Sequence, residues 1–336
     1  MDETIDAEII EVVICTYNNA ALLEHTLRSV SEQNTQPELR WRVTVVDNNS
    51  SDVTAQVVER FQRGDRIPKL RYLFEPRQGL TFARLCAFSN ATATWVLFVD
   101  DDNLLAPDFV INAAKFASSH PRCGAFGACV RLQENPASPL PVEWQPLVVS
   151  TQDWGNLPQR LPDNGLVHLI GAGLAVKREA AVASGWLDRQ FLTGRTGQQL
   201  SGGEDIELVL LVRKAGYELW YNPTCNLRHI VPQRRATPEY LKRIWRGNAA
   251  AMTFLSGMYP NQDLFAIWLI GKLGRIVLLC ARGLLMGLPH RAGTDVQLRR
   301  ILIWAECRGR IDGLQMALAL PSSERRVWFG YAKFPQ

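Results

Sequence analysis

Three consecutive carboxylates directly follow a short apolar run near residue 100. Asp100, Asp101 and Asp102 come after residues 95–99, which are all apolar. Like charges at a strand end repel one another unless a cation or a hydrogen-bond donor compensates them. Mg²⁺ and Mn²⁺ take oxygen ligands of this kind, and Mg²⁺ commonly links one or two carboxylates to the phosphates of a substrate. The Asp100-x-Asp102 spacing therefore predicts a Mg²⁺ or Mn²⁺ site facing a diphosphate, and a solvated helix-capping turn is the alternative.

Three other polar clusters stand in equivalent positions within the first 130 residues. They occupy residues 16–19, 47–51 and 75–79, and each follows a β-rich run, at 9–15, 41–47 and 69–75, just as the acidic cluster ends the β-rich run at 95–100. Segments of helical period follow all four runs, at 20–33, 52–61, 81–91 and 107–119. Repeated β-then-α units predict a doubly wound, mostly parallel sheet, whose ligands bind beyond the carboxyl ends of the strands. We therefore expect the four clusters to meet at one edge of this sheet.

The ordered set of motifs resembles the family 2 glycosyltransferases of the GT-A fold. The resemblance rests on residues 12–18, 45–52, 79–84, 98–103 and 203–208, and it covers residues 9 to about 250. Two positions depart from the family's pattern: Cys15 stands where the family often has proline, and Arg77 where many members have asparagine. The resemblance implies inverting transfer of a sugar from a nucleotide-diphosphate donor, with UDP as the expected nucleotide.

The resemblance also implies a set of donor-binding residues, most of which follow the predicted strands. These are Thr16, Tyr17, Asn18, Asp47, Asn49, Gly79, Arg84, Asp100 and Asp101. Among them, Asp47 would accept a hydrogen bond from the imide N–H of uracil, and Gly79 would let the backbone approach the donor closely. Arg84 would lie near the diphosphate or the sugar. Asp100 or Asp101 would contact the ribose or the sugar.

The same resemblance implies which residues bind the metal. Asp102 is the main candidate ligand, with Asp100 and His229 as further candidates. The family often places a histidine at the position of His229, beside the metal or the diphosphate. For an isolated histidine a core or capping role is the more common one, and it stays open as the alternative for His229.

Inverting transfer needs a carboxylate that removes the proton of the acceptor hydroxyl. Glu204 and Asp205 follow a glycine-rich segment and open a segment of helical period at 204–215. A helix N-terminus favours an ionised carboxylate, and the family's Glu-Asp motif implies that the aspartate is the base. We therefore expect Asp205 to be the base and Glu204 to be the alternative base. The other interpretation is that both residues are the ordinary acidic residues of a helix N-terminus and have no catalytic role.

The expected architecture is α/β, with a GT-A, Rossmann-like sheet that is mostly parallel and flanked by helices. The catalytic domain would span residues 1–235, with a nucleotide-sugar half at 9–130 and an acceptor half at 131–235. Strands are expected at 171–177 and 217–222. From residue 236 to 336 the pattern is helical, which indicates a separate C-terminal extension.

This C-terminal region combines apolar segments with basic side chains. Residues 228–310 carry an excess of ten positive charges, whereas the whole chain has a net charge of only +4. Residues 264–288 are largely apolar, and their three charges, Lys272, Arg275 and Arg282, fall on one stripe. Three cations at the centre of a membrane span would cost about 2.5–3.5 kcal/mol each. We therefore expect residues 264–318 to lie on an anionic membrane surface, and packing on the catalytic domain or a second subunit is the alternative.

Composition limits the remaining classes of function. The chain has 336 residues, 47% hydrophobic and 21% charged, which is ordinary for a globular protein and excludes wholesale disorder. The small net charge argues against a nucleic-acid binder. Seven scattered cysteines without a Cys-x-x-Cys pair argue against a disulfide framework or a zinc ribbon. The acidic start lacks the features of a signal peptide, so we expect a cytoplasmic protein on the inner face of the cell membrane.

The expected function is a metal-dependent, inverting glycosyltransferase of cell-surface polysaccharide synthesis, with a glycan or lipid-linked acceptor. A nucleotidyltransferase on a similar sheet is one alternative. It usually has a glycine-rich, basic loop after the first strand, and residues 16–19 contain neither glycine nor a basic residue. A catalytically silent nucleotide-sugar-binding membrane scaffold is the second alternative. The presence of both Asp102 and Asp205 argues against it.

Overall fold

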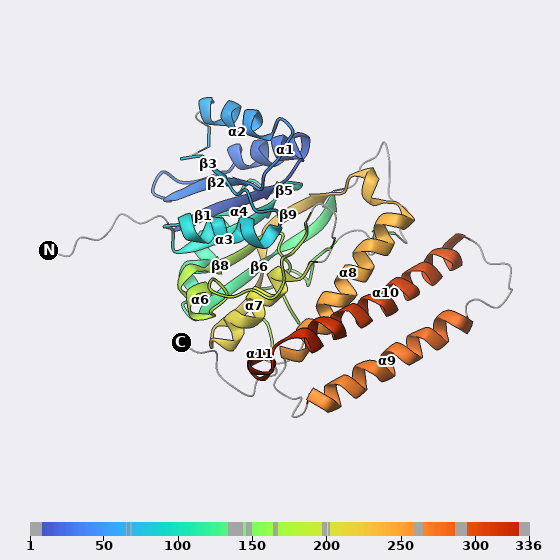
Figure 1. Ribbon diagram of the computed structural model, residues 1–336. Helices are drawn as coiled ribbons and strands as arrows, with labels where there is room; N and C mark the ends of the chain where they lie inside the picture. Colours follow the sequence, from blue (N-terminus) through green and yellow to red (C-terminus); the bar gives the residue numbers. More distant parts are fainter. Residues whose placement is uncertain are drawn as a thin grey trace. The chain divides into compact units, whose positions relative to one another are not determined.

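The computed structural model describes residues 9–64, 66–67, 69–133, 144–145, 150–163, 167–196, 200, 202–258, 265–285 and 294–328. Within these residues, the strands form one sheet in the order β3-β2-β1-β4-β8-β6-β9-β5, and β7 pairs with β9 (Figure 1). The chain divides into two compact units. The first contains residues up to 163, 167–193 and 204–231, and the second consists chiefly of the residues from 232 onward.

The first four predicted strands are present and lie side by side in the sheet. They are β1 (Ile10–Thr16), β2 (Trp41–Asp47), β3 (Arg71–Phe74) and β4 (Trp95–Asp100), and their mutual pairings are parallel. The side chains of β1, β2 and β4 are almost all buried on both faces. This burial explains why their sequences read as continuous apolar runs rather than as alternating patterns.

Four helices follow these strands, close to the segments of helical period. They are α1 (Ala20–Ser31), α2 (Thr54–Arg63), α3 (Leu80–Asn90) and α4 (Phe109–Ser119). Asp52 stabilises two of the helix starts, because its carboxylate accepts the N–H groups of Ala20 and Thr54 at 3.0 and 3.1 Å. The parallel β/α half predicted from the sequence is therefore confirmed.

The other half of the sheet is mixed, so antiparallel strands join the mostly parallel sheet that was predicted from the sequence. β8 (Leu174–Lys177) runs antiparallel to β4, and β6 (Cys123–Gln133) runs antiparallel to β8 and parallel to β9 (Glu218–Ile230). Two short strands, β5 (Asn103–Leu105) and β7 (Gln159–Arg160), pair antiparallel with β9. The fold is thus α/β with a mixed, mostly parallel sheet.

Strand β9 is longer than the predicted strand at 217–222. Its register with β6 shifts between Ala128 and Cys129, where Asn222 is followed by Asn226 as the next paired residue. Pro223 falls in this irregular stretch, because proline cannot donate to a regular ladder. The strand then continues to Ile230 and brings His229 into the sheet.

Two helices complete the first unit. α6 (Arg178–Ala183) follows β8, and α7 (Glu204–Lys214) packs against α6, β6 and β9. The first turn of α7 holds Glu204, Asp205 and Glu207, and its last turn holds Arg213 and Lys214. This distribution of charge stabilises both ends of the helix dipole.

The second unit is helical, as expected from the sequence. Its long helices are α8 (Pro238–Leu255), α9 (Phe265–Leu285) and α10 (Thr294–Ala319), followed by α11 (Ser322–Trp328). Two short 3-10 helices, Gln233–Arg235 and Ser256–Met258, flank α8. α10 packs against both α8 and α9, as the orange and red helices in Figure 1 show. In the described part of the chain, every helix is too short or too polar to cross a bilayer.

Candidate active site

The carboxyl ends of β1, β2 and β4 bring three of the four polar clusters to one edge of the sheet, namely residues 16–19, residues 47–51 and the acidic cluster. Thr16 pairs in register with Asp47, and Cys15 pairs in register with Asp100. Neighbouring strands lie about 4.8 Å apart. The side chains at these strand ends are therefore near neighbours, although they are far apart in the sequence.

The loop after β1 binds the middle carboxylate of the acidic cluster. Thr16 Oγ1 donates to Asp101 Oδ2 at 2.7 Å, and Asn19 Nδ2 donates to Asp101 Oδ1 at 2.8 Å. Burial, together with the neighbouring Asp102, raises the pKa of Asp101. The two donors compensate part of the negative charge, as expected for like charges at a strand end.

The carboxylate of Asp47 is held in a fixed orientation at the end of β2. Its Oδ1 accepts the N–H of Ser50 at 2.8 Å, and its Oδ2 accepts the hydroxyl of Tyr72 at 2.7 Å. Burial and this hydrogen bond raise the pKa of Tyr72. Asp47 itself is buried. It can still accept a further hydrogen bond, because a carboxylate has about four lone-pair positions.

Two asparagines near this edge adopt a left-handed backbone. Asn18 has φ of 49° and Asn49 has φ of 64°, a region that asparagine tolerates better than most residues. Asn18 Oδ1 accepts the N–H of Ser51 at 2.7 Å, which ties the β1 loop to the β2 loop. Tyr17 lies between Thr16 and Asn18 with 40% of its surface exposed, so its ring is available to a ligand.

Asn48 connects the β2 loop to the start of α3. Its Oδ1 accepts the N–H of Gly79 at 2.8 Å, and its Nδ2 donates to the carbonyl of Arg77 at 2.6 Å. Gly79 precedes α3 with φ of 140°, a conformation that favours glycine. Glu75 binds Arg77 through two hydrogen bonds of 2.8 and 2.9 Å, which lower the pKa of Glu75. Arg77, which stands where many family members have asparagine, thus stabilises its own loop through Glu75.

Asp102 and His229 form a buried pair at the other side of the acidic cluster. His229 Nε2 lies 3.2 Å from Asp102 Oδ1, and both side chains are at least nine-tenths buried. The pairing of β5 with β9 sets this contact, because it places Asn103 opposite His229 and joins the Ile230 N–H to the carbonyl of Asp102 at 2.8 Å. Asp100 ends β4, and its N–H is bound by Asn103 Oδ1 at 3.0 Å.

The chemistry of these groups suits a hard divalent cation whose coordination shell is completed by atoms of a substrate. Among the residues that the structure describes, no three His, Cys, Asp or Glu side chains gather as a ready set of ligands. Mg²⁺, however, usually takes only one or two protein carboxylates and completes its shell with substrate phosphates and water. The pair of Asp102 and His229 fits such a partial set.

The two carboxylates that open α7 have different surroundings. Glu204 is buried and pairs with Arg84, with 3.2 Å between Oε1 and Nη1. Asp205 is half-buried, and its carboxylate accepts the N–H of Gly171 at 2.6 Å and of Ile206 at 2.9 Å. A buried ion pair that loses one partner typically costs about 3–5 kcal/mol. Glu204 is therefore held in a buried ion pair, whereas Asp205 is partly exposed.

Several residues at this site were not predicted from the sequence. They are Asn19, Asn48, Tyr72, Gly171 and Glu207. Asn19 and Asn48 lie inside polar clusters that the sequence singled out. Glu207 lies one helical turn after Glu204, so its position on the buried face could have been inferred from the helical period. The sequence holds no comparable signal for Gly171 or Tyr72.

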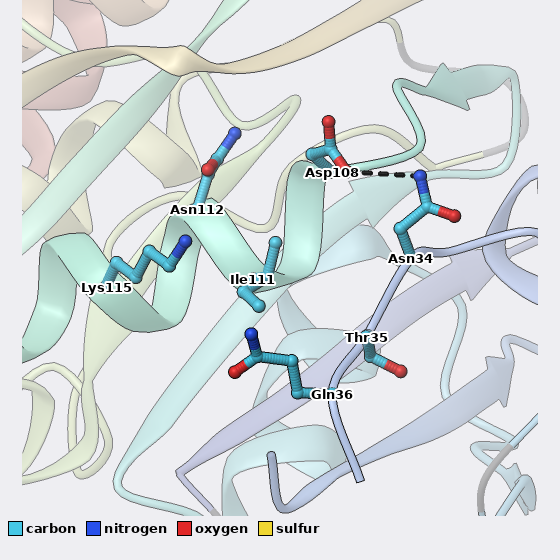
Figure 2. A pocket seen from close by; sticks show the side chains of 7 residues that line it. All are labelled: Asn34, Thr35, Gln36, Asp108, Ile111, Asn112 and Lys115. Atoms are coloured by element: carbon cyan, nitrogen blue, oxygen red, sulfur yellow. Dashed lines mark hydrogen bonds between the residues drawn. The ribbon is translucent and has the colours of Figure 1, made fainter. Parts of the chain in front are cut away.

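A surface cavity of about 520 Å³ lies apart from these residues. Figure 2 shows its lining by residues 34–36, which follow α1, and by Asp108, Ile111, Asn112 and Lys115 in and before α4. Asn34 Nδ2 donates to Asp108 Oδ1 across it at 3.2 Å. None of the predicted site residues lines this cavity.

Comparison with known proteins gives relatives along most of the chain. The succinoglycan biosynthesis protein ExoM of Rhizobium meliloti (strain 1021) is 26% identical over 308 residues, which cover 91% of this chain and 92% of that protein. An N-acetylglucosaminyltransferase of the same strain is 27% identical over 302 residues, which cover 86% of this chain and 67% of that protein.

A solved structure shares the fold. It is the mannosyltransferase PcManGT from Pyrobaculum calidifontis in complex with GDP-Man and Mn²⁺, with a TM-score of 0.58 at 20% identity. The similarity covers 92% of this chain and 88% of that one. The family model described as Glycosyl transferase family 2 matches residues 11–182, from β1 to α6. With half of its length matched by this model, the chain belongs to glycosyl transferase family 2 and is a glycosyltransferase.

Proposed function

We propose that the protein is an inverting, metal-dependent transferase that moves a sugar from a nucleotide-diphosphate donor to a glycan or lipid-linked acceptor. The observation that carries this proposal is the gathering of Asp47, Asp101 and Asp102 at one sheet edge. The relative ExoM is named for succinoglycan biosynthesis, which supports a role in cell-surface polysaccharide synthesis. Catalysis would reside in residues 1–235, and residues 236–336 would form the extension.

The donor would bind along the ends of β1, β2 and β4. Asp47, fixed by Ser50 and Tyr72, offers an oriented acceptor for the imide N–H of uracil. Thr16, Tyr17, Asn18 and Asn49 would line the nucleotide, and Gly79 would leave room for the diphosphate. Asp100 and Asp101 would contact the ribose or the sugar. Because one relative is named an N-acetylglucosaminyltransferase, UDP-N-acetylglucosamine is the first donor to test.

Asp102 and His229, with Asp100 nearby, would hold Mg²⁺ or Mn²⁺. A bound cation would neutralise the charge that develops on the leaving diphosphate. The mannosyltransferase of the same fold is described with Mn²⁺, so Mn²⁺ is the first metal to test.

Asp205 would act as the base. Its carboxylate would remove the proton of the acceptor hydroxyl while the hydroxyl oxygen attacks the anomeric carbon from the face opposite the leaving diphosphate. This geometry inverts the configuration at that carbon. The N–H groups of Gly171 and Ile206 stabilise the ionised carboxylate, and the N-terminus of α7 adds to this effect.

The test combines donor binding with transfer. We expect a nucleotide sugar to bind the purified protein in the presence of Mn²⁺, measured by calorimetry, and Asp102→Asn to lose this metal-dependent binding. Asp205→Asn should retain donor binding and lose about 10²–10⁴-fold in turnover. Asp188→Asn, an exposed position outside the site, is the control. Full transfer by Asp205→Asn, or transfer that is unaffected by removal of metal, would contradict the mechanism.

We further propose that the protein works at the inner face of the cell membrane and binds it through α9 and α10. On α9, seven large aliphatic side chains are between 47% and 71% exposed, at Ile267, Ile270, Leu273, Val277, Leu278, Leu284 and Leu285. They recur at the spacing of one helical face. Arg275 and Arg282 are exposed, and α9 carries no acidic residue. An apolar face with cations beside it is typical of helices that lie in an anionic membrane surface.

Vesicle flotation tests this second proposal. We expect the protein to float with phosphatidylglycerol-containing vesicles and much less with neutral phosphatidylcholine vesicles. The triple variant Ile270→Asp, Val277→Asp and Leu284→Asp should remain unbound. Val182→Asp is the control, because Val182 on α6 is 54% exposed and lies outside the C-terminal helices. Flotation by the triple variant would contradict the proposal. Self-association of the wild-type protein without flotation would instead assign this face to a second copy.

A further inference from the structure

Arg84 lies inside the protein rather than at the surface of the donor site. Its side chain is 3% exposed, and its guanidinium lies 5.1 Å above the ring of Phe98 on β4. Its described ionic partner is Glu204, at 3.2 Å. Arg84 comes from α3 and Glu204 from α7, so this ion pair joins the helix that follows the donor loops to the helix that carries Asp205.

A second connection links the same two helices. Thr81, in the first turn of α3, donates its hydroxyl to the carbonyl of Leu192 at 2.7 Å. The carboxylate of Glu207 on α7 accepts the N–H groups of Phe191 and Leu192 at 2.8 and 2.9 Å. Glu204 and Glu207 lie three residues apart and therefore on one face of α7. The start of α3 and the start of α7 are thus held together at two points.

Gly171 leaves room for Arg84 beside Asp205. A Cβ atom at Gly171 would overlap Arg84 Nη2 and would lie 3.0 Å from Asp205 Oδ2. The guanidinium and the carboxylate of Asp205 therefore border the same small space, and the N–H of Gly171 binds that carboxylate. A side chain at this position would separate the two charged groups.

The charges around Arg84 are of opposite sign to its own. Glu204, Asp205 and Asp100 each favour its charged form, and together they outweigh burial, so the pKa of Arg84 is raised. Cys15 lies within the same electrostatic range, and Glu207 interacts with Glu204 one turn further along α7. The cation beside Asp205 thus comes from α3, and Glu204 precedes Asp205 in α7.

We propose that Arg84 and Glu204 form a positioning pair for Asp205, in place of a donor contact by Arg84 or proton transfer by Glu204. The ion pair fixes the first turn of α7 against α3, which itself begins at Gly79 beside the donor loops. It also balances the charge next to Asp205. This inference rests on the proposed role of Asp205 as the base.

The pair predicts opposite changes in the pH dependence of turnover. Arg84→Met removes a cation that lies next to the Asp205 carboxylate, so the ionised base loses a favourable electrostatic contact and the acidic limb of turnover moves to higher pH. Glu204→Gln removes a carboxylate and leaves the cation, so the acidic limb moves to lower pH. Each single variant should lose about 100-fold in turnover, because a small displacement of the base is enough for such a loss.

The experiment measures turnover against pH and the dissociation constant of the donor for four proteins: wild type, Arg84→Met, Glu204→Gln and the double variant. Both single variants should bind the donor as the wild type does. The double variant carries neither charge, so its pH profile should return toward the wild-type profile, and its loss should be smaller than the product of the single losses. Circular dichroism checks that each variant is folded, and the double variant avoids a buried unpaired charge.

The outcomes separate this inference from the proposed function. Asp205→Asn is measured in parallel, and transfer by that variant would contradict the base assignment itself. The next test applies only if Asp205→Asn is inactive. The positioning pair would then be overturned if the acidic limbs of Arg84→Met and Glu204→Gln shifted in the same direction. It would also be overturned if the loss of turnover in the double variant equalled the product of the two single losses. A large increase in the donor dissociation constant for Arg84→Met alone would instead assign Arg84 to donor binding.

Discussion

The Nε2 atom of His229 lies 3.2 Å from Oδ1 of Asp102, and both side chains are buried. The contact is made by the end of β9, which the antiparallel pairing with β5 holds beside the acidic cluster. In the proposed mechanism, His229 would either share a cation with Asp102 or orient the Asp102 carboxylate toward one. In both cases the imidazole would act on the metal rather than on the acceptor.

The first prediction concerns this contact. His229→Gln should weaken Mn²⁺ binding in the presence of UDP by about 10–100-fold, because ligands and the groups that orient them contribute affinity of this size. Titration of Mn²⁺ followed by electron paramagnetic resonance measures the change. His25→Gln, at an exposed position on α1, is the control. Unchanged Mn²⁺ affinity in His229→Gln would exclude His229 from the metal site.

The sequence was sufficient to predict the parallel half of the sheet and the residues at the carboxyl ends of its strands. Strands β2 and β4 have the predicted bounds, because buried apolar runs flanked by polar turns are local signals. The order of β and α elements then places Thr16, Asp47 and Asp100 at one edge, since parallel strands end on the same side. The chemistry expected of these residues needed no knowledge of distant contacts.

The remaining features depend on contacts that no local pattern contains. The antiparallel insertion of β8 between β4 and β6 is a property of the whole sheet. The partner of Arg84 is 120 residues away, and local sequence gives no sign that its guanidinium is buried. Gly171 matters because the side chains of Arg84 and Asp205, from two different helices, leave no space for a side chain there. Such features become visible only when the chain is folded.

The second prediction concerns the buried carboxyl of Glu207. Burial raises its pKa to about 8, although the N–H groups of Phe191 and Leu192 act in the opposite direction. In the unfolded chain the pKa of glutamate is about 4.3, so the native state binds this proton more tightly. The stabilising contribution is complete below about pH 4 and is lost as the pH rises toward 8.

Glu207→Gln removes this pH dependence. The difference in free energy of unfolding, Glu207→Gln minus wild type, should therefore increase by about 1.4 kcal/mol per pH unit as the pH rises within this range. Urea unfolding at several pH values measures the difference. Glu32→Gln, at an exposed position at the end of α1, should show no such trend. A constant difference between wild type and Glu207→Gln would show that Glu207 titrates normally.

The third prediction tests the packing of α8 against α10. A Cβ atom at Gly309 would overlap the carbonyl oxygen of Arg246, and one at Gly313 would overlap that of Ala250. Because the obstacles are backbone atoms, the helices must separate, and each Gly→Ala variant should destabilise the protein by about 1–3 kcal/mol. Thermal unfolding measures the loss.

Two glycines on α9 provide the matched comparison. A Cβ atom at Gly271 or Gly274 would meet no atom within 4 Å. Alanine at either position should therefore stabilise the helix by about 0.5–1 kcal/mol, because glycine is unfavourable within a helix. If all four variants change stability alike, the close contact between α8 and α10 is absent.

The fourth prediction uses a pair of cysteines between α9 and α10. Cys280 Sγ lies 3.8 Å from Cys307 Sγ, and both thiols are free. Diamide should oxidise them to a disulfide within one chain, with two electrons and two protons passing to the reagent. Burial raises the pKa of Cys307, so the reaction should accelerate at alkaline pH. The closed loop should stabilise the protein by about 3 kcal/mol, measured by urea unfolding without reductant.

Cys280→Ser should abolish this stabilisation by diamide. Crosslinked dimers instead of monomers on a non-reducing gel would mean that α9 does not pack on α10 as described.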